Sequence, residues 1–334
     1  MRKREQTDGQ RSIAHRQAPI APDPRPLPTD HSPMTAATQA ALRHAPTLAY
    51  VGMGAGILAL GFSALFVRWA SAPGPVTGFY RMAIASLVLV PLAVLRDGDP
   101  RRWHRAGLKA AALGGASLSF DLALWNTAVL NTSAANATLL ANTAPLWVAV
   151  AARILLKERL RPSFWVGLLL VLSGAAAVLG ADFLTDFHLG VGDLMAIGAG
   201  VFYAGYYLAT QSGRRHLGSL AYVASAGTAS TLVLLVLVGL LGLPLTGYPT
   251  QTWGAFVALG LVTQVLGYVA VGYALGHLRA SLVAPTMVGQ PVMTALLAIP
   301  LLGERLTAVQ WIGGAAVLAG IVLVHRSNRA AAEV

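Results

Sequence analysis

Long apolar runs dominate the chain after residue 45, and short polar segments separate them. An α-helix needs about 20 apolar residues to cross the hydrocarbon core of a bilayer. This criterion predicts ten membrane-spanning helices, at residues 47–70, 75–95, 108–129, 132–153, 163–180, 192–211, 219–242, 252–276, 280–302 and 308–325. Turn formers such as Pro73-Gly74-Pro75 mark the boundaries. The expected fold is an all-α integral membrane protein.

The same pattern occurs twice in the chain. Leu155-Leu156-Lys157-Glu158-Arg159-Leu160, followed by Trp165, Gly167 and Gly174, recurs 146 residues later as Leu301-Leu302-Gly303-Glu304-Arg305-Leu306, followed by Trp311, Gly313 and Gly320. Pro145 and Pro291 keep this register. A fixed period inside an apolar chain indicates duplication of a membrane module. We therefore expect two five-helix repeats, at residues 46–181 and 190–326.

Lysine and arginine predict the orientation of these helices. With the N-terminus inside, the cytoplasmic segments carry Arg96, Arg101, Arg102, Arg105, Lys109, Arg153, Lys157, Arg159, Arg161, Arg214, Arg215, Arg279, Arg326 and Arg329, and the outer segments carry Arg68 and Arg305. Because positive charge favours the cytoplasmic side, both termini are expected inside a bacterial inner (plasma) membrane. An odd number of helices per repeat makes the two repeats inverted.

Composition agrees with a membrane protein. Hydrophobic residues make up 55% of the chain, charged residues 11%, and the mean hydropathy is +0.62, whereas soluble domains carry about 25% charged residues. The net charge of +11 is spread over linkers, so no nucleic-acid partner is expected. The chain has no cysteine. Residues 1–45, rich in proline and basic residues, are expected to form a disordered cytoplasmic tail.

Taken together, these features resemble the drug/metabolite transporter superfamily, and within it the EamA-type exporters. The resemblance covers residues 47–325 and includes Phe79-Tyr80-Arg81 at the second helix and the run 132–140 at the fourth. It implies secondary transport of small polar metabolites, often export of amino acids, through a central cavity between the repeats. Asp121 departs from the family, in which many relatives carry an uncharged residue or histidine there. Any proton-coupling role of Asp121 is therefore not inherited.

Two charged residues lie well inside the predicted spans, away from their ends. Asp121 is the carboxylate placed deepest, and burial of a charge at mid-bilayer costs about 2.5–3.5 kcal/mol, so it is a candidate for binding a substrate ammonium group or a proton. A helix-to-helix hydrogen bond is the structural alternative. Arg81 is a candidate for a substrate carboxylate. Its alternative is anchoring, because the side chain could extend to the interface.

Aromatic and amide side chains supply further candidate substrate contacts. Tyr203, Tyr206 and Tyr207 share a helix face that Gln211 extends, and Gln264 and Tyr268 share another. The remaining candidates are Trp125, Asn126, Asn136, Asn142 and Gln290. Such groups suit a cavity that holds a small zwitterion. Interfacial tyrosines and helix-to-helix amide bonds are the alternatives.

Pro145 and Pro291 each remove a backbone donor in the middle of a predicted helix, which predicts paired kinks for gating or, alternatively, for structure alone. Glu158 and Glu304 lie in short turns beside arginine, where helix capping is the expected role.

Enzymatic motifs are missing from the sequence. No His-Glu-x-x-His pair, Gly-x-Ser-x-Gly elbow or phosphate-binding loop occurs. We expect no enzyme activity, no cofactor and no metal. The leading hypothesis is an alternating-access exporter of amino acids or similar metabolites, compatible with a monomer, whose partners are its substrate and the lipid bilayer. The alternatives are an accessory or scaffold membrane protein and an intramembrane enzyme with a lone aspartate.

Overall fold

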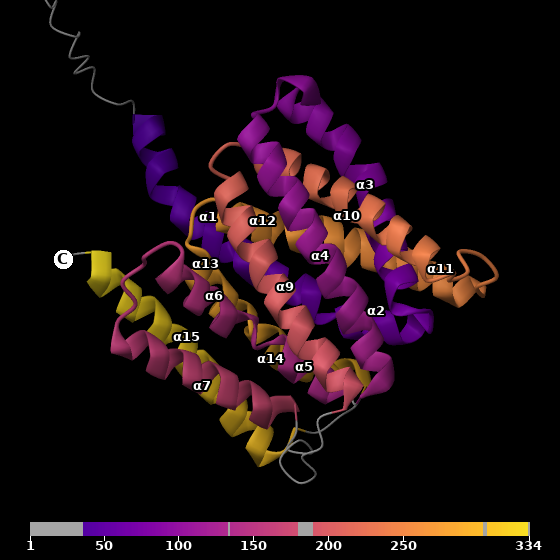
Figure 1. The fold of residues 1–334 in the computed structure, drawn as a ribbon. Coiled ribbons are helices and arrows are strands. Elements are labelled where there is room, and N and C mark those ends of the chain that lie inside the picture. Colours follow the sequence, from indigo (N-terminus) through magenta and orange to yellow (C-terminus); the bar gives the residue numbers. More distant parts are fainter. Residues whose placement is uncertain (1–35, 133, 180–189, 303–305, 333–334) are drawn as a thin grey trace, which may run out of the picture. The chain divides into compact units, whose positions relative to one another are not determined.

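The computed structural model describes residues 36–132, 134–179, 190–302 and 306–332, and the regular elements of these ranges are helices (Figure 1). The chain divides into two units, residues 1–40 and 41–334, and the packing described below lies within the second. Asp182, Asp186 and His188, which lie between the two expected repeats, are outside the described residues, as are Glu304 and Arg305.

The helices follow one another in chain order. The first half contains α1 (Ala36–Gly61), α2 (Ser63–Ala70), α3 (Gly74–Asp97), the 3₁₀ turn η1 (Pro100–Arg102), α4 (Arg105–Asn131), α5 (Ala134–Ala141), α6 (Ala144–Ile154) and α7 (Pro162–Leu179). The second half contains α9 (Val191–Gly213), α10 (Ser219–Leu240), α11 (Thr250–Ala258), the π-helix η2 (Leu259–Tyr268), α12 (Val269–Leu275), α13 (Ala280–Met287), α14 (Gly289–Leu302) and α15 (Ala308–Ala332).

Helical structure occupies each of the ten predicted spans, which confirms the all-α membrane fold. Among the described residues, eight helical segments are long and apolar enough to cross a membrane. The two predicted spans outside this set have identifiable features. In α4, Asp121, Asn126 and two serines lower the mean hydropathy, and the span predicted at 280–302 is divided between α13 and α14.

The predicted N-terminal tail needs one correction. Its described part, residues 36–45, is helical and continues directly into the first span as α1. The physical reason is the composition of this stretch, Ala36-Ala37-Thr38-Gln39-Ala40-Ala41-Leu42, because alanine, leucine and glutamine favour helix strongly. Residues 1–35 of the predicted tail lie outside the described residues.

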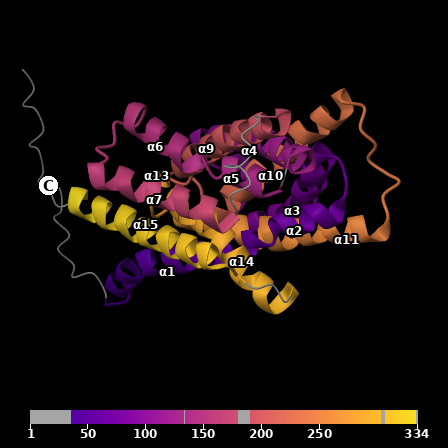
Figure 2. The ribbon, with the colours of Figure 1, turned by 90° about the horizontal axis from the view of Figure 1, so that it is seen from below.

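Helices α7 and α15 occupy equivalent places in the two sequence repeats, and they pack against one another along their length (Figures 1 and 2). A Cβ atom at Gly174 would lie 2.6 Å from the carbonyl oxygen of Gly313, and one at Gly167 would lie 3.0 Å from that of Gly320. The partners thus run in opposite order along the two helices. Repeat-related helices that cross antiparallel are what an inverted repeat requires.

A second repeat-related pair, α3 and α10, crosses in the same sense. Gly78 lies against Leu234, whereas Ser86 lies against Gly227, so these helices are also antiparallel. The hydroxyls of Ser86 and Thr231 lie 3.4 Å apart within this crossing. The two halves of the chain are therefore packed directly on one another through α3 and α10.

Contacts between the halves also occur as matched pairs. A Cβ atom at Gly52 on α1 would meet the carbonyl oxygen of Ala270 on α12 at 3.2 Å. The equivalent positions of the repeats are Gly198 on α9 and Leu124 on α4, and a Cβ atom at Gly198 would lie 3.3 Å from Leu124. Each half thus packs its first helix against the third helix of the other half. Helices from both halves of the chain therefore form the centre of the bundle.

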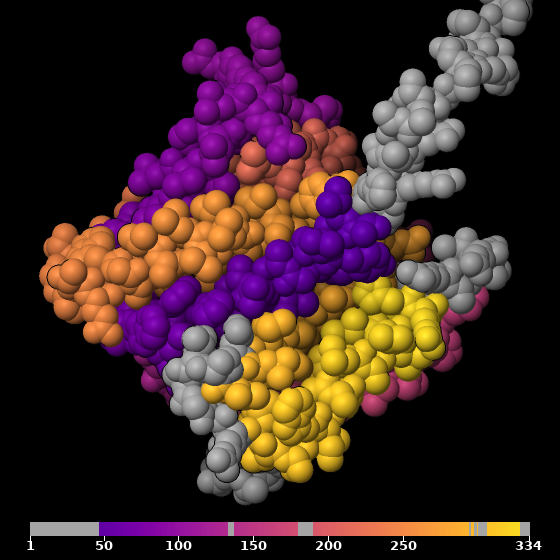
Figure 3. Space-filling view, turned by 180° about the vertical axis from the view of Figure 1, so that it is seen from behind, coloured from indigo at the N-terminus to yellow at the C-terminus, as the bar shows by residue number. Residues whose placement is uncertain are grey.

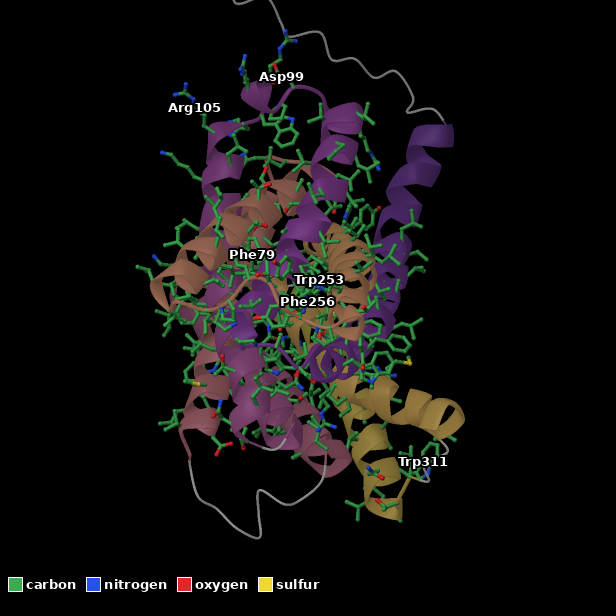
Figure 4. The ribbon with its side chains drawn as sticks, turned by 90° about the vertical axis from the view of Figure 1, so that its right-hand side faces the viewer. Phe79, Asp99, Arg105, Trp253, Phe256 and Trp311 are labelled. Atoms are coloured by element: carbon green, nitrogen blue, oxygen red, sulfur yellow. The ribbon has the colours of Figure 1, made fainter. Side chains whose placement is uncertain are left out.

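Charged and aromatic residues distinguish the two ends of the bundle. Asp99 and Arg105 lie at one end and Trp311 at the other, with Phe79, Trp253 and Phe256 between them (Figure 4). The ring of Tyr80 stacks on Phe256 at 4.7 Å and meets Trp253 edge-on at 4.8 Å. These rings join α3 to α11 and position the first turns of α3, where Arg81 follows directly.

Candidate functional site

Arg81 is buried, with only 2% of its surface exposed. Its Nε donates a hydrogen bond to Oε1 of Gln264 at 3.0 Å, and one terminal nitrogen donates to Oγ of Ser63 at 3.1 Å. Its guanidinium also lies over the ring of Tyr268, 5.4 Å from the centroid. Hydrogen bonds to a charged group and a cation–π contact offset part of the cost of burial. The side chain therefore points into the bundle, and the anchoring alternative of an arginine extended to the interface is wrong.

Asp121 is also buried, at 7% exposure, on the neighbouring helix α4. Its carboxylate lies within electrostatic reach of the Arg81 guanidinium and of the hydroxyls of Tyr203, Tyr207 and Tyr268. An acid and a base from the first half of the chain are thus held near one another. A carboxylate taken out of water is costly, and Arg81 is an opposite charge within its reach.

The three predicted tyrosines of α9 do share one face, and that face meets η2. The ring centroids of Tyr203 and Tyr207 lie 4.6 Å apart, those of Tyr206 and Tyr268 5.5 Å apart, and those of Tyr203 and Tyr268 6.5 Å apart. Tyr206 and Tyr207 are almost fully buried, and Tyr203 is half-buried. We call the whole group the central polar cluster; its members are Ser63, Arg81, Asp121, Tyr203, Tyr206, Tyr207, Gln264 and Tyr268.

Gln264 and Tyr268 lie on a π-helix rather than the expected α-helix. A π-helix widens the turn, and such segments are rare and frequently occur at functional sites. The equivalent stretch of the first repeat, residues 113–122, is regular α-helix within α4. The two repeats therefore differ where they supply groups to the central polar cluster.

The other predicted site residues lie outside this cluster. Trp125 packs with an apolar group that includes Val67 and Leu259. Asn126 is buried and donates from Nδ2 to the carbonyl oxygen of Gly74 at 3.1 Å, while its Oδ1 has no hydrogen-bond partner among the described residues. The amide oxygen of Gln211 accepts a hydrogen bond from the backbone N–H of Ala280. The side chain of Asn136 is not among those described.

The paired prolines each follow a short interruption of the helix, and the expected kinks at these positions stay predictions. Helix α5 ends at Ala141 and α6 begins at Ala144, so Asn142 lies in the break and Pro145 in the first turn of α6. Helix α13 ends at Met287 and α14 begins at Gly289, so Gln290 and Pro291 lie in the first turn of α14. Proline fits a first turn because its missing N–H has no intrahelical partner there.

These two breaks coincide in the repeat. Residue 142 of the first repeat corresponds to residue 288 of the second at the 146-residue offset, and both lie between the paired helices. Interrupted helices expose backbone groups near the middle of the membrane, which is tolerated only inside protein or beside water. Equivalent interruptions in inverted repeats are typical of transporter binding regions.

Sequence reasoning missed the contacts of two residues, Ser63 and Glu158. Ser63 bonds Arg81 but carries no pattern that separates it from other serines in apolar helices. Glu158, expected to cap a helix, instead accepts a hydrogen bond at Oε2 from Oγ of Ser281 at 2.8 Å. This bond ties the turn between α6 and α7 to the first turn of α13. It lies beside the Gln211 contact with Ala280.

Comparisons with known proteins agree with this geometry. The sequence profile of the EamA-like transporter family matches residues 46–180 and again residues 190–326. A crystal structure of another protein superposes with a TM-score of 0.71 at 21% identity, over 84% of this chain and 98% of that one. At that identity the likeness shows the fold.

Three relatives are similar over most of their length. The uncharacterized transporter YwfM of Bacillus subtilis is 25% identical over 262 residues, covering 75% of this chain and 84% of YwfM. A probable terminal-alkyne amino-acid exporter of Streptantibioticus cattleyicolor is 28% identical over 251 residues, covering 74% and 82%. An uncharacterized transporter of Archaeoglobus fulgidus is 25% identical over 272 residues, covering 80% and 92%.

Proposed function

This chain belongs to the EamA-like transporter family and is a multi-pass membrane transporter, not an enzyme, and we propose that it exports amino acids or similar small zwitterionic metabolites. The observation that carries the proposal is the burial of two opposite charges, Asp121 and Arg81, on the packed helices α4 and α3. Asp121 would receive the substrate ammonium group and Arg81 its carboxylate. The similarity to a probable terminal-alkyne amino-acid exporter supports the same substrate class.

Groups around the two charges would complete recognition. Gln264 and Ser63 orient the Arg81 guanidinium, and Tyr203, Tyr207 and Tyr268 lie within electrostatic reach of Asp121. Orientation by fixed hydrogen bonds and aromatic walls is how small-molecule sites obtain specificity. Trp125, Asn126, Asn142 and Gln290 stay candidates for contact along the pathway rather than within the cluster.

The antiparallel packing of α7 on α15 and α3 on α10 supports transport by alternating access, because inverted repeats can exchange conformations by rocking against one another. We place both termini on the cytoplasmic side of a bacterial inner membrane, following the arginine and lysine distribution. In that orientation the bonds of Glu158 to Ser281 and of Gln211 to Ala280 close the cytoplasmic side of the bundle.

Counterflow in proteoliposomes tests this function. Vesicles preloaded with unlabelled amino acid should accumulate the radiolabelled amino acid, and N-acetylated or decarboxylated analogues should compete poorly because each lacks one of the two charges. Empty liposomes and vesicles that contain the Arg81→Gln variant are the controls, with Arg68→Gln as the matched exposed arginine. No counterflow across a panel of amino acids would leave the proposed substrate class without support.

A further inference from the structure

A groove that contains no residue of the central polar cluster lies on the surface of the bundle. This groove of about 400 Å³ is lined by Tyr50, Met53, Gly54 and Ile57 of α1, Thr286 of α13, and Ile321, Val322, His325 and Arg326 of α15. Figure 3 shows the face on which α1 and α15 approach one another. Its volume falls within the range of small-molecule sites, about 300–1,000 Å³.

The groove is apolar along its length and polar at one end. Met53, Ile57, Ile321 and Val322 form the apolar part, and neighbouring side chains such as Val51 and Leu318 are exposed, as expected where helices face lipid. Tyr50 lies near the start of the first span, Thr47–Ala70, and His325 and Arg326 near the end of the last, Ala308–Ser327. The polar end therefore coincides with the membrane–water interface.

The polar end is held in place by specific contacts. The Thr286 hydroxyl donates to the carbonyl oxygen of Leu282 at 2.7 Å, so its oxygen must accept the 2.8 Å hydrogen bond from Nε2 of His325. The His325 ring also meets Tyr50 edge-on at 5.5 Å. Arg326 beside it is exposed, and no carboxylate is among the described residues that line the groove. The end thus offers a positive charge to an anion at headgroup depth.

We propose that this groove binds one anionic phospholipid, with the phosphate at Arg326 and His325 and an acyl chain along Met53, Ile57 and Ile321. Basic pockets between transmembrane helices recognise acidic headgroups through this combination of charge and apolar surface. The lipid would bridge α1, α13 and α15. It is bound independently of the transported substrate.

Native mass spectrometry of the full chain tests the proposal. Protein purified in detergent is mixed with equal amounts of phosphatidylglycerol and phosphatidylcholine, and the lipid retained is identified. The wild type should retain phosphatidylglycerol preferentially. Arg326→Gln should reduce that preference about fivefold, the effect of about one basic residue at a membrane surface. Arg215→Gln, which removes an exposed arginine outside the groove, should leave it unchanged.

A second variant tests the apolar part. A Cβ atom at Gly54 meets nothing within 4 Å, so Gly54→Leu fills the groove without a backbone clash and should abolish retention of the lipid. Gly254→Leu is the matched control, since Gly254 on α11 is equally open and lies outside the groove. Equal retention of both lipids by the wild type, equal loss in the variants and their controls, or displacement of the lipid by amino acids would each overturn the proposal.

Discussion

Nε of Arg81 donates a hydrogen bond to Oε1 of Gln264 at 3.0 Å, and the two residues come from opposite halves of the chain. The bond joins α3 to the π-helix η2 inside the bundle, where Gln264 is 1% exposed. An anion-binding arginine must be oriented before substrate arrives, and this bond supplies the orientation. Gln264 is thus a positioning residue in the proposed mechanism.

Gln264→Leu should raise the KM for transported amino acid more than it lowers the maximal rate. The Arg81 guanidinium would lose a buried hydrogen bond, which for a charged partner is worth about 1.5–3 kcal/mol. Initial rates in proteoliposomes over a range of substrate concentrations measure the change. Gln251→Leu, at an exposed position of α11, is the control, and the same KM in both variants would contradict the positioning role.

Close packing of α7 on α15 predicts a stability effect that is independent of transport. A Cβ atom at Gly174 would lie 2.6 Å from Gly313 O and 2.7 Å from Val317 N, both backbone atoms that cannot rotate away. Gly174→Ala should therefore destabilise the fold by about 1–3 kcal/mol, the usual cost of overpacking. The melting temperature in detergent should fall below that of Gly254→Ala, whose new methyl group meets open space; equal melting temperatures would argue against this helix contact.

Glu158 and Ser281 should be energetically coupled. Either Glu158→Ala or Ser281→Ala breaks the 2.8 Å bond between the α6–α7 turn and α13, so the second substitution should cost little once the first is present. Stability of the wild type, both single variants and the double variant gives the coupling energy, expected at about 1.5–3 kcal/mol for a bond to a charged group. Strictly additive effects would show that the two side chains act separately.

Orientation in the membrane can be measured directly because the chain has no cysteine of its own. Cysteines introduced by Asp99→Cys and Arg215→Cys should react only with reagents that reach the cytoplasm, and Asp186→Cys only with external reagents. The basis is the excess of lysine and arginine in the segments placed inside. Labelling of position 215 from outside an intact cell would reverse the proposed topology.

Much of this fold follows from local chemistry. Runs of about 20 apolar residues are stable as helices across a membrane and not in water, and so the all-helical membrane fold was predictable. Likewise, Tyr203, Tyr206 and Tyr207 share a face because their spacing matches the helical turn. The 146-residue period predicted which helices would be equivalent, and α7 and α15 do pack as antiparallel partners.

The remaining features depend on contacts between distant segments. Arg81 turns inward because Gln264 and Ser63 accept its hydrogen bonds, which a single helix pattern cannot reveal. Residues 259–268 adopt a π-helix although their sequence is an ordinary apolar run. The bounds of the two five-helix repeats, residues 46–181 and 190–326, stay predictions.

The central claim is that the charge of Asp121 binds the substrate ammonium group. The variant Asp121→Asn tests this claim most directly. The substitution keeps the shape and hydrogen-bonding capacity of the side chain and removes only its charge. Counterflow of an amino acid is measured for this variant and for the control Asp99→Asn, with expression and melting temperature monitored, from about pH 5.5 to about pH 8. We predict that Asp121→Asn folds normally and transports far more slowly than the control at every pH. Transport at the wild-type rate across this range would show that Asp121 is a packing residue and that the substrate ammonium group binds elsewhere.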